Sequence, residues 1–209
     1  MSKFLLTLAL LLFIGLSQTP PNWGGNPRYS VKVLFVYNDP VTNWTFNYYY
    51  DWSVKAERYE HLQGQYDEVC MLPQTSFKKT GQPCNVIFAT DTWFYIQFPT
   101  ENFCCKCSSN FGAIRYDWLK TDSTYNGTTT MGGYTVSHWI KNGQYLNHYY
   151  STVDKGLPVL FHEIKGGNPK EWKFDLSTYN TGPFDPSKLQ APANCQTKCG
   201  GTCDTLPRK

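Results

Sequence analysis

This sequence has little leucine outside its N-terminus, little net charge and no second long apolar run. Seven of its 17 leucines lie in the first 17 residues, so only ten remain in the rest of the chain. The formal net charge of +3 is too weak for a protein that binds nucleic acid through phosphates. No later stretch approaches the roughly 20 apolar residues that a membrane helix needs. These absences exclude nucleic acid as the main partner and a transmembrane segment after residue 17.

The N-terminus is predicted to be a secretory signal peptide that covers residues 1–17. Lys3 precedes an apolar run from Phe4 to Leu16, and Gly15 and Ser17 are the small residues at −3 and −1 of a cleavage site. The remaining residues 18–209 have the length of one domain with a cysteine-rich C-terminal tail.

Cysteines and sequons both agree with export. All eight cysteines follow residue 17, and an even number in an exported chain predicts four disulfides. A metal cluster is the alternative that their spacing permits, but an oxidising compartment favours disulfides. Two sequons predict N-glycosylation at Asn43 and Asn126. The cysteines are Cys70, Cys84, Cys104, Cys105, Cys107, Cys195, Cys199 and Cys203.

Aromatic residues are abundant and point to strands. The sequence has 15 tyrosines, 13 phenylalanines and 7 tryptophans, a composition that favours strands over helices. Short alternating runs separated by turn residues therefore predict an all-β domain with at most a minor α-helical part. The last four runs are predicted to form a meander. The runs are 29–37, 44–52, 54–63, 86–88, 93–98, 134–141, 144–152, 157–165 and 170–176.

Asn142-Gly143 is the strongest hairpin signal in the chain. A two-residue turn there pairs Val136 with Tyr149, which places two apolar side chains on one face. The same register puts His138 and His148 on alternate faces and argues against a metal site that uses both. In the next hairpin, a two-residue turn pairs Phe161 with Trp172.

Strand parity predicts one shared apolar interior. The runs 86–88 and 93–98 are apolar on both faces, so they are covered on both sides or line a cavity. A curved sheet of such strands encloses a hydrophobic ligand, whereas a sandwich core fills the same space with side chains. Both alternatives remain open from the pattern alone. The candidate ligand-pocket residues are Phe35, Phe46, Tyr48, Phe94, Ile96, Phe98, Val136, Phe161, Trp172 and Phe174.

No catalytic motif is recognisable. The chain has no Gly-x-Ser-x-Gly elbow, and His162-Glu163 lacks the second histidine of a zinc protease because Gly166 occupies that position. We therefore predict that His162 is a half-buried packing residue. The acidic residues are scattered, so no pair is selected for glycoside chemistry and no EF-hand loop is present. We assign no catalytic residue and no metal ligand, and we expect a protein that is not an enzyme.

Several weak motifs, taken in order, resemble one family. Pro20–Gly25 matches a Pro-x-x-Trp-x-Gly opening, and residues 184–196 match a Pro-rich segment that leads to a disulfide cysteine. Between them stand Tyr37 with the aromatic run 44–52, the run 94–98 ending at Cys104, Gly132-Gly133, Val136-Ser137-His138-Trp139 and Leu157-Pro158-Val159. From Pro20 to Cys195 the chain resembles the ependymin-related proteins, which are secreted or lysosomal glycoproteins. It lacks two of the family's usual cysteines, near Thr19 and Leu157.

The resemblance implies a fold and a set of partners. The fold is a two-layer curved antiparallel sheet, a half-barrel similar to bacterial lipoprotein carriers, around a deep hydrophobic pocket. The implied partners are a lipid-like ligand, calcium and a second copy of the chain in a homodimer. The resemblance also implies that Cys104 or Cys105 pairs with Cys195. Cys70 or Cys84 would then pair with Cys199 or Cys203.

Three functional hypotheses follow. The first is an ependymin-like glycoprotein that binds a hydrophobic ligand, with a role in cell-matrix adhesion, in the extracellular space or the lysosomal (vacuolar) lumen. The second is a secreted hydrolase whose carboxylates or histidines meet only in the fold. The third is a structural extracellular matrix protein without a ligand.

Overall fold

Twelve strands form one continuous sheet in the order β12-β6-β5-β4-β3-β2-β1-β11-β10-β9-β8-β7. The computed structural model describes residues 18–37, 39–64, 67–73, 81–109, 112–166 and 168–205. The predicted signal peptide, residues 1–17, lies outside these ranges. The strands are β1 (Arg28–Tyr37), β2 (Asp39–Asp51), β3 (Ala56–His61), β4 (Cys84–Phe88), β5 (Trp93–Phe98), β6 (Phe103–Ser109), β7 (Ser123–Met131), β8 (Tyr134–Asn142), β9 (Leu146–Thr152), β10 (Pro158–Lys165), β11 (Asn168–Asn180) and β12 (Thr197–Lys198).

Helical structure is confined to short turns. Within the described ranges every helix is a 3-10 helix, so the minor α-helical part that we expected is absent there. None of these helices has the length and apolar composition of a membrane span. They are η1 (Trp23–Gly25), η4 (Pro99–Glu101), η5 (Trp118–Lys120), η6 (Pro186–Leu189) and η7 (Gly201–Thr205).

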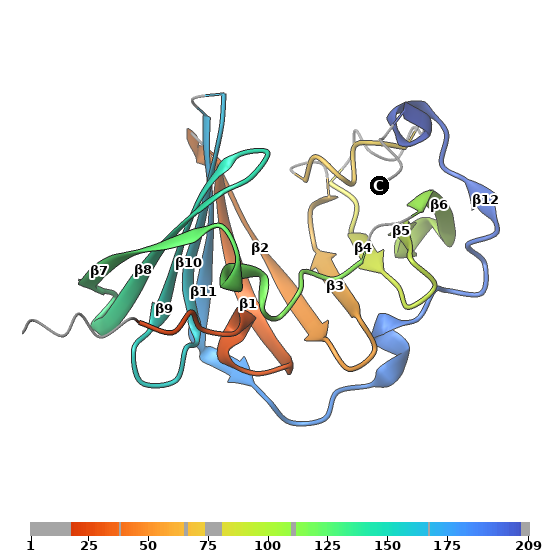
Figure 1. Ribbon diagram of the computed structural model, residues 1–209. Helices are drawn as coiled ribbons and strands as arrows, with labels where there is room; N and C mark the ends of the chain where they lie inside the picture. The colour runs from red at the N-terminus through yellow and green to blue at the C-terminus, as the bar shows by residue number, and fades with distance from the viewer. Residues whose placement is uncertain are drawn as a thin grey trace, which may run out of the picture.

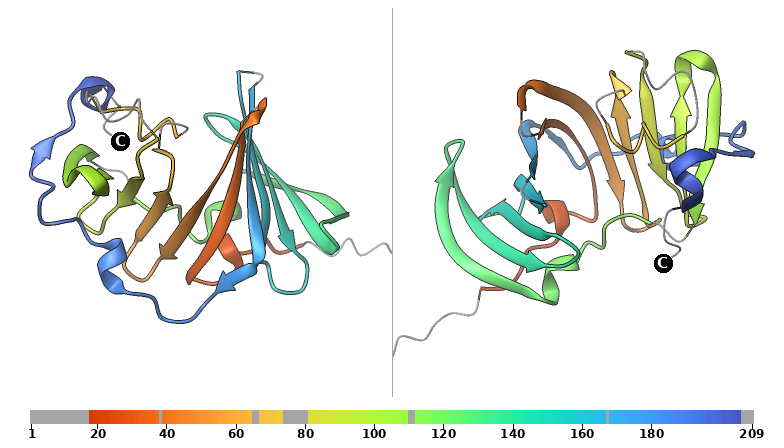
Figure 2. Two further views of the ribbon diagram at one scale, coloured as in Figure 1. Left: turned by 180° about the vertical axis from the view of Figure 1, so that it is seen from behind. Right: turned by 90° about the horizontal axis from the view of Figure 1, so that it is seen from above.

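The sheet is strongly curved (Figure 1). Strands β1 and β2 lie at its middle, and the two halves of the sheet bend away from them to form opposite walls (Figure 2). Neighbouring strands are antiparallel except for the short parallel pair of β12 and β6. The all-β, antiparallel half-barrel that we predicted is thus confirmed, with a single folded sheet supplying both layers.

The meander predicted for residues 134–176 is present as β8, β9, β10 and β11. In the β10–β11 hairpin, Phe161 pairs with Trp172 as predicted. In the β8–β9 hairpin the predicted register is wrong, because Asn142 pairs with Leu146 and the loop has three residues. Three-residue hairpin loops are a common alternative to two-residue turns. The change turns every side chain of one strand to the other face relative to its partner.

The altered register has a clear physical benefit. It places Trp139 opposite Tyr149, and both side chains are buried in the main core. Val136 then pairs with Thr152 and faces away from that core, although it is also buried. The large aromatic pair buries more apolar area than the predicted pair of Val136 with Tyr149, and burial is favourable in proportion to that area.

Four disulfides are present, as predicted. Three of them join β6 to the C-terminal tail and form what we call the β6 disulfide ladder: Cys104–Cys195, Cys105–Cys199 and Cys107–Cys203. The bond between Cys104 and Cys195 is one of the two pairings that the family resemblance implies. The second implied pairing is wrong, because Cys70 and Cys84 are bonded to each other. Cys84 begins β4, and Cys70 precedes it by only 14 residues, so this bridge is local in the sequence.

Candidate functional site

The two walls of the sheet enclose a cavity of about 790 Å³. Its walls come from β1, β2, β3, β4, β10 and β11, and its lining is mostly aromatic and aliphatic. This volume lies within the 300–1,000 Å³ range of small-molecule sites in proteins. The apolar lining consists of Trp23, Val33, Phe35, Tyr37, Trp44, Phe46, Tyr48, Tyr59, Val69, Met71, Val86, Phe88, Ile114, Tyr145, Phe161, Trp172 and Phe174.

Trp23 forms the floor of this cavity. Its ring is buried edge-on against Phe161 and Phe174, with ring centroids 5.8 and 5.9 Å apart. Its indole Nε1 donates a hydrogen bond of 3.2 Å to the hydroxyl of Tyr48. The next residue, Gly24, has a φ of +67°, and a Cβ there would lie 2.2 Å from the ring of Tyr29. Only glycine fits beside that ring, so Gly24 allows the neighbouring Trp23 to pack at the floor of the cavity.

A buried carboxyl group stands behind the cavity wall. Glu57 on β3 is 2 % exposed and accepts hydrogen bonds from the hydroxyls of Tyr48, at 2.7 Å, and Tyr59, at 3.0 Å. The backbone N–H of Ile114 donates a third, at 3.3 Å. Burial raises the pKa of Glu57 from 4.5 to about 7, although these three donors pull it in the opposite direction. Tyr48, Tyr59 and Ile114 all line the cavity, so this network fixes the wall.

The Glu57 carboxyl should make stability depend on pH. Its native pKa of about 7 is above the value of 4.5 for a free side chain, so the native state holds this proton more tightly than the unfolded chain. The resulting stabilisation is full below pH 4.5 and is lost as the pH rises through 7. We expect the loss to be about 3 kcal/mol. Glu57→Gln, which cannot titrate, should lack this component.

Urea unfolding at several pH values from 4.5 to 8 measures this difference. Other titrating groups are common to both proteins, so the gap between the two curves isolates Glu57. If the free energies of unfolding of the wild type and of Glu57→Gln changed in parallel with pH, Glu57 would be ionised in the native state over this whole range. That result would contradict the prediction.

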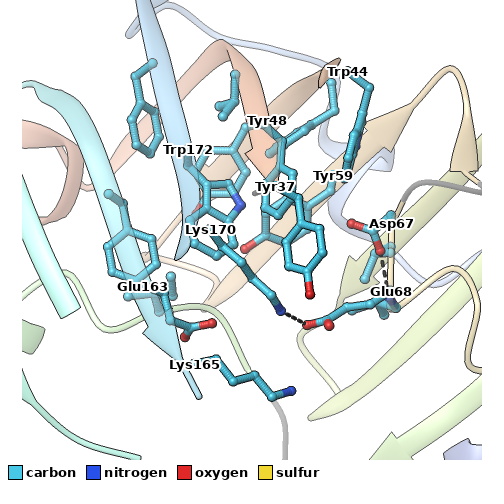
Figure 3. A pocket seen from close by; sticks show the side chains of 18 of the residues that line it. Tyr37, Trp44, Tyr48, Tyr59, Asp67, Glu68, Glu163, Lys165, Lys170 and Trp172 are labelled. Carbon is cyan, nitrogen blue, oxygen red and sulfur yellow. Dashed lines mark hydrogen bonds and ion pairs between the residues drawn. The ribbon is translucent and has the colours of Figure 1, made fainter. Parts of the chain in front are cut away.

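The opening of the cavity is charged. Of the charged lining residues, Glu68 and Lys165 are exposed and mark this opening, and Glu163 lies beside them. Lys170 on β11 reaches across to Glu68, and its Nζ lies 2.5 Å from the carboxylate Oε1 (Figure 3). The side chain of Lys170 is 6 % exposed, whereas that of Glu68 is 65 % exposed. This ion pair spans the opening and joins β11 to the segment that precedes β4.

A second ion pair holds the same segment in place. His61 Nε2 lies 3.1 Å from Asp67 Oδ2, and Asp67 Oδ1 accepts hydrogen bonds from the backbone N–H groups of Val69 and Cys70. Burial raises the pKa of Asp67, but His61 and the backbone N–H groups of Cys70 and Val69 together outweigh burial and hold that pKa below its usual value. The segment 67–70 is therefore fixed at the cavity edge by charge and by the Cys70–Cys84 bond.

The structure brings six of the ten candidate pocket residues together in the cavity lining. The six are Phe35, Phe46, Tyr48, Phe161, Trp172 and Phe174. Phe94, Ile96 and Phe98 are buried instead in a second apolar cluster with the cysteines of β6 and the tail. Phe94 pairs with the lining residue Phe88 and stacks on it, so the two lie on the same face of the sheet. Phe94, Ile96 and Phe98 are outside the cavity because the disulfide-bonded segments cover that part of the face. Val136 is outside it because of the β8–β9 register.

Sequence reasoning missed the floor and the opening. In the sequence, Trp23 stands in the opening motif of the ependymin-related resemblance. That motif does not indicate that the side chain packs under the cavity. Glu57, Glu68 and Lys170 carry no local signal, because their contacts join segments far apart in the chain. The pair of Glu68 and Lys170, for example, is separated by 102 residues.

Groups of three or more metal-ligating residues come together in two places in the described part of the chain. One group is Cys107 with Cys199 and Cys203, and the other is His61 with Asp67 and Cys70. Each includes cysteines that are bonded in disulfides, so neither offers a full set of free ligands. Asn43 and Asn126, the predicted glycosylation sites, are both exposed.

A curved sheet with an aromatic cavity, a closed floor and a charged opening defines a half-barrel protein with an internal apolar cavity. The family described as Domain of unknown function (DUF8395) matches residues 27–195. The chain therefore belongs to that family. No curated protein sequence matches it.

Several solved structures are similar to this chain at very low sequence identity. An uncharacterised conserved protein from Thermus thermophilus matches with a TM-score of 0.53 and 10% identity, over 81% of this chain and 88% of that one. MucB of Pseudomonas aeruginosa, in complex with MucA, matches with a TM-score of 0.45 and 16% identity, over 81% of this chain and 57% of that one. The lipoprotein LppX of Mycobacterium tuberculosis matches with a TM-score of 0.41 and 8% identity, over 75% and 88%. The Thermus protein shows that the fold recurs, and at 10% identity the likeness concerns the fold alone.

Proposed function

We propose that this protein binds a hydrophobic, lipid-like molecule inside the half-barrel and does not transform it. The observation that carries the proposal is the cavity of about 790 Å³ with its mostly aromatic and aliphatic lining. Burial of an alkyl chain contributes about 0.8 kcal/mol per methylene group, or about 8 kcal/mol for ten of them before entropic costs. Micromolar affinity requires a net binding free energy of about −8 kcal/mol, so burial of ten methylene groups supplies an amount of that order before the entropic costs are subtracted. No catalytic group is needed for it.

The charged opening supports an amphiphilic ligand. Such a molecule would place its alkyl chain against Trp23 and Phe161 and leave its polar end among Glu163, Lys165 and Lys170. A ligand can enter only when the Lys170–Glu68 ion pair opens. The Glu68 side chain is exposed and can rotate into solvent. Polar groups at the rim of an apolar site typically fix the orientation of the ligand.

The proposal includes export from the cell and a relationship to the ependymin-related proteins. Four disulfides are typical of proteins that fold in an oxidising compartment, and both sequons are accessible for N-glycosylation. Calcium binding, a homodimer, an adhesion role and a lysosomal location stay predictions that come from the resemblance.

Titration with a fluorescent fatty acid tests the binding function. The purified protein is expected to bind the probe saturably, with one site and a dissociation constant in the micromolar range, and unlabelled oleate should displace it. Mass spectrometry of the extracted probe should show that it is chemically unchanged. Absence of saturable binding would refute the proposal, and recovery of a cleaved ester probe would favour the hydrolase hypothesis instead.

A further inference from the structure

Three histidines lie in a row on the face of the sheet that points away from the cavity. They are His138 on β8, His148 on β9 and His162 on β10. Trp139 and Tyr149 of the same strands are buried in the main core, so strand alternation puts the histidines on the opposite face. The three-residue loop of the β8–β9 hairpin is what brings His138 and His148 to one face.

The imidazole rings are in close contact. His138 Nε2 lies 2.9 Å from His148 Nδ1. His148 and His162 are direct partners across the β9–β10 pair, and their ring centroids are 5.6 Å apart. The ring of Tyr150 lies flat against His138, at 4.3 Å and an interplanar angle of 12°. All three histidines are half-buried, so their rings are held in place and remain accessible on one side.

Neighbouring side chains define the hydrogen-bond directions in this row. The amide Nδ2 of Asn126 lies 3.0 Å from His138 Nδ1 and donates to it. His138 Nε2 therefore carries the proton and donates to His148 Nδ1. The Nε2 atom of His162 is buried and has no hydrogen-bond partner among the described residues.

We propose that the pair of His138 and His148 in this row binds one borderline divalent transition-metal ion, Cu²⁺ or Zn²⁺. His138 Nε2 and His148 Nδ1 supply the two nitrogen ligands, whereas His162 lies beyond His148 in the row and is not a ligand. Metal–nitrogen bonds are about 2.0–2.1 Å, so two nitrogens of a tetrahedral site are about 3.3 Å apart. The observed 2.9 Å requires only a small separation of the two rings.

Binding requires one proton to move within His138, with no net release. The Nε2 proton is transferred to Nδ1 by exchange with solvent, the Asn126 amide turns so that its Oδ1 accepts the new Nδ1–H, and the metal accepts the lone pairs of His138 Nε2 and His148 Nδ1. Water completes the coordination. Imidazole suits Cu²⁺ and Zn²⁺, whereas Ca²⁺ requires oxygen ligands, so this site is distinct from the calcium binding that the family resemblance implies.

Isothermal titration calorimetry with Zn²⁺ and electron paramagnetic resonance with Cu²⁺ test the site on protein that carries no histidine tag. The wild-type protein should bind one equivalent, with nitrogen hyperfine structure in the Cu²⁺ spectrum. His148→Gln retains a polar side chain but removes the central imidazole. We expect it to weaken binding about tenfold or more and to simplify the spectrum. His138→Gln should have the same effect.

Lys173→Gln is the matched control, because Lys173 pairs with Glu171 beside the row and contributes no imidazole. This variant should bind Zn²⁺ and Cu²⁺ as the wild type does. Titration with Ca²⁺ should give no heat signal that the histidine variants lose. Thermal unfolding confirms that each variant is folded. Binding that is absent from the wild type, or unchanged in both folded histidine variants, would overturn the proposal.

Discussion

Replacing Phe161 with aspartate is expected to abolish saturable binding of a fluorescent fatty acid. The Phe161 ring lies between the floor and the wall of the cavity, with its centroid 5.8 Å from that of Trp23 and 4.8 Å from that of Trp172. A carboxylate there would face an alkyl chain without a partner, and an unpaired charge in an apolar site costs several kcal/mol. We expect affinity to fall by about 100-fold or more, since each 1.4 kcal/mol is a factor of ten.

Ile164→Asp is the matched control for that variant. Ile164 lies on the same strand, but alternation puts it on the outer face, and it is not part of the cavity lining. This variant introduces the same charge three residues away and should keep the wild-type affinity. Equal loss of binding in both variants, with both folded, would mean that the cavity is not the binding site.

Removal of the β6 disulfide ladder is expected to unfold the protein. Its three bridges close loops of 91, 94 and 96 residues, and one such bridge contributes about 4–5 kcal/mol by loop-closure entropy. When one bridge is present, a second closes only a small additional ring and adds less. Whole domains are stable by only about 5–15 kcal/mol. A variant with alanine at all six ladder cysteines should therefore lose cooperative unfolding.

Variants that lack one ladder bridge should behave differently. Cys104→Ala combined with Cys195→Ala leaves the long loop closed by the other two bridges, so we expect a cooperative transition at lower denaturant concentration. Guanidinium unfolding followed by tryptophan fluorescence separates these cases. The account would be contradicted if the six-alanine variant unfolded at the same midpoint as the two-alanine variant, because the two remaining bridges would then add no stability by closing the long loop.

Local pattern predicted much of the fold, since strand alternation depends on neighbouring residues. The runs that became β1, β2 and β8–β11 alternate strongly, and the pair of Phe161 with Trp172 follows from a short turn. The strand β7 was missed because most of its side chains are polar and exposed, so it has no apolar face to reveal it. The strand β6 was missed because its cysteines were interpreted as disulfide partners and not as strand residues.

The register of one hairpin illustrates why pattern alone fails. Asn142-Gly143 favours a two-residue turn, but the burial of Trp139 against Tyr149 favours a loop of three residues. The choice depends on what the paired strands pack against, which the turn sequence does not encode. The three-residue loop places Val136 outside the cavity and brings His138 and His148 to the same face of the sheet.

The remaining features of the cavity depend on long-range contacts. The six lining residues that were predicted lie on regular strands, where parity is sufficient. Trp23, Glu57 and Lys170 each contact residues on distant segments. Strand parity does not predict which segment covers a given face of the sheet. Phe94 shows the same limit, because it lies on the same face as Phe88 but is packed in the cluster with the disulfide-bonded cysteines.

A crystal structure of the protein with a brominated fatty acid tests the central claim most directly. Bromine can be located by anomalous scattering, independently of how the alkyl chain is interpreted. The account predicts a bromine peak inside the cavity, near Trp23, Phe161 or Phe174, with the carboxylate toward Lys165 and Lys170. Saturable binding in solution with the bromine elsewhere on the surface, and the cavity closed by its own side chains, would contradict it.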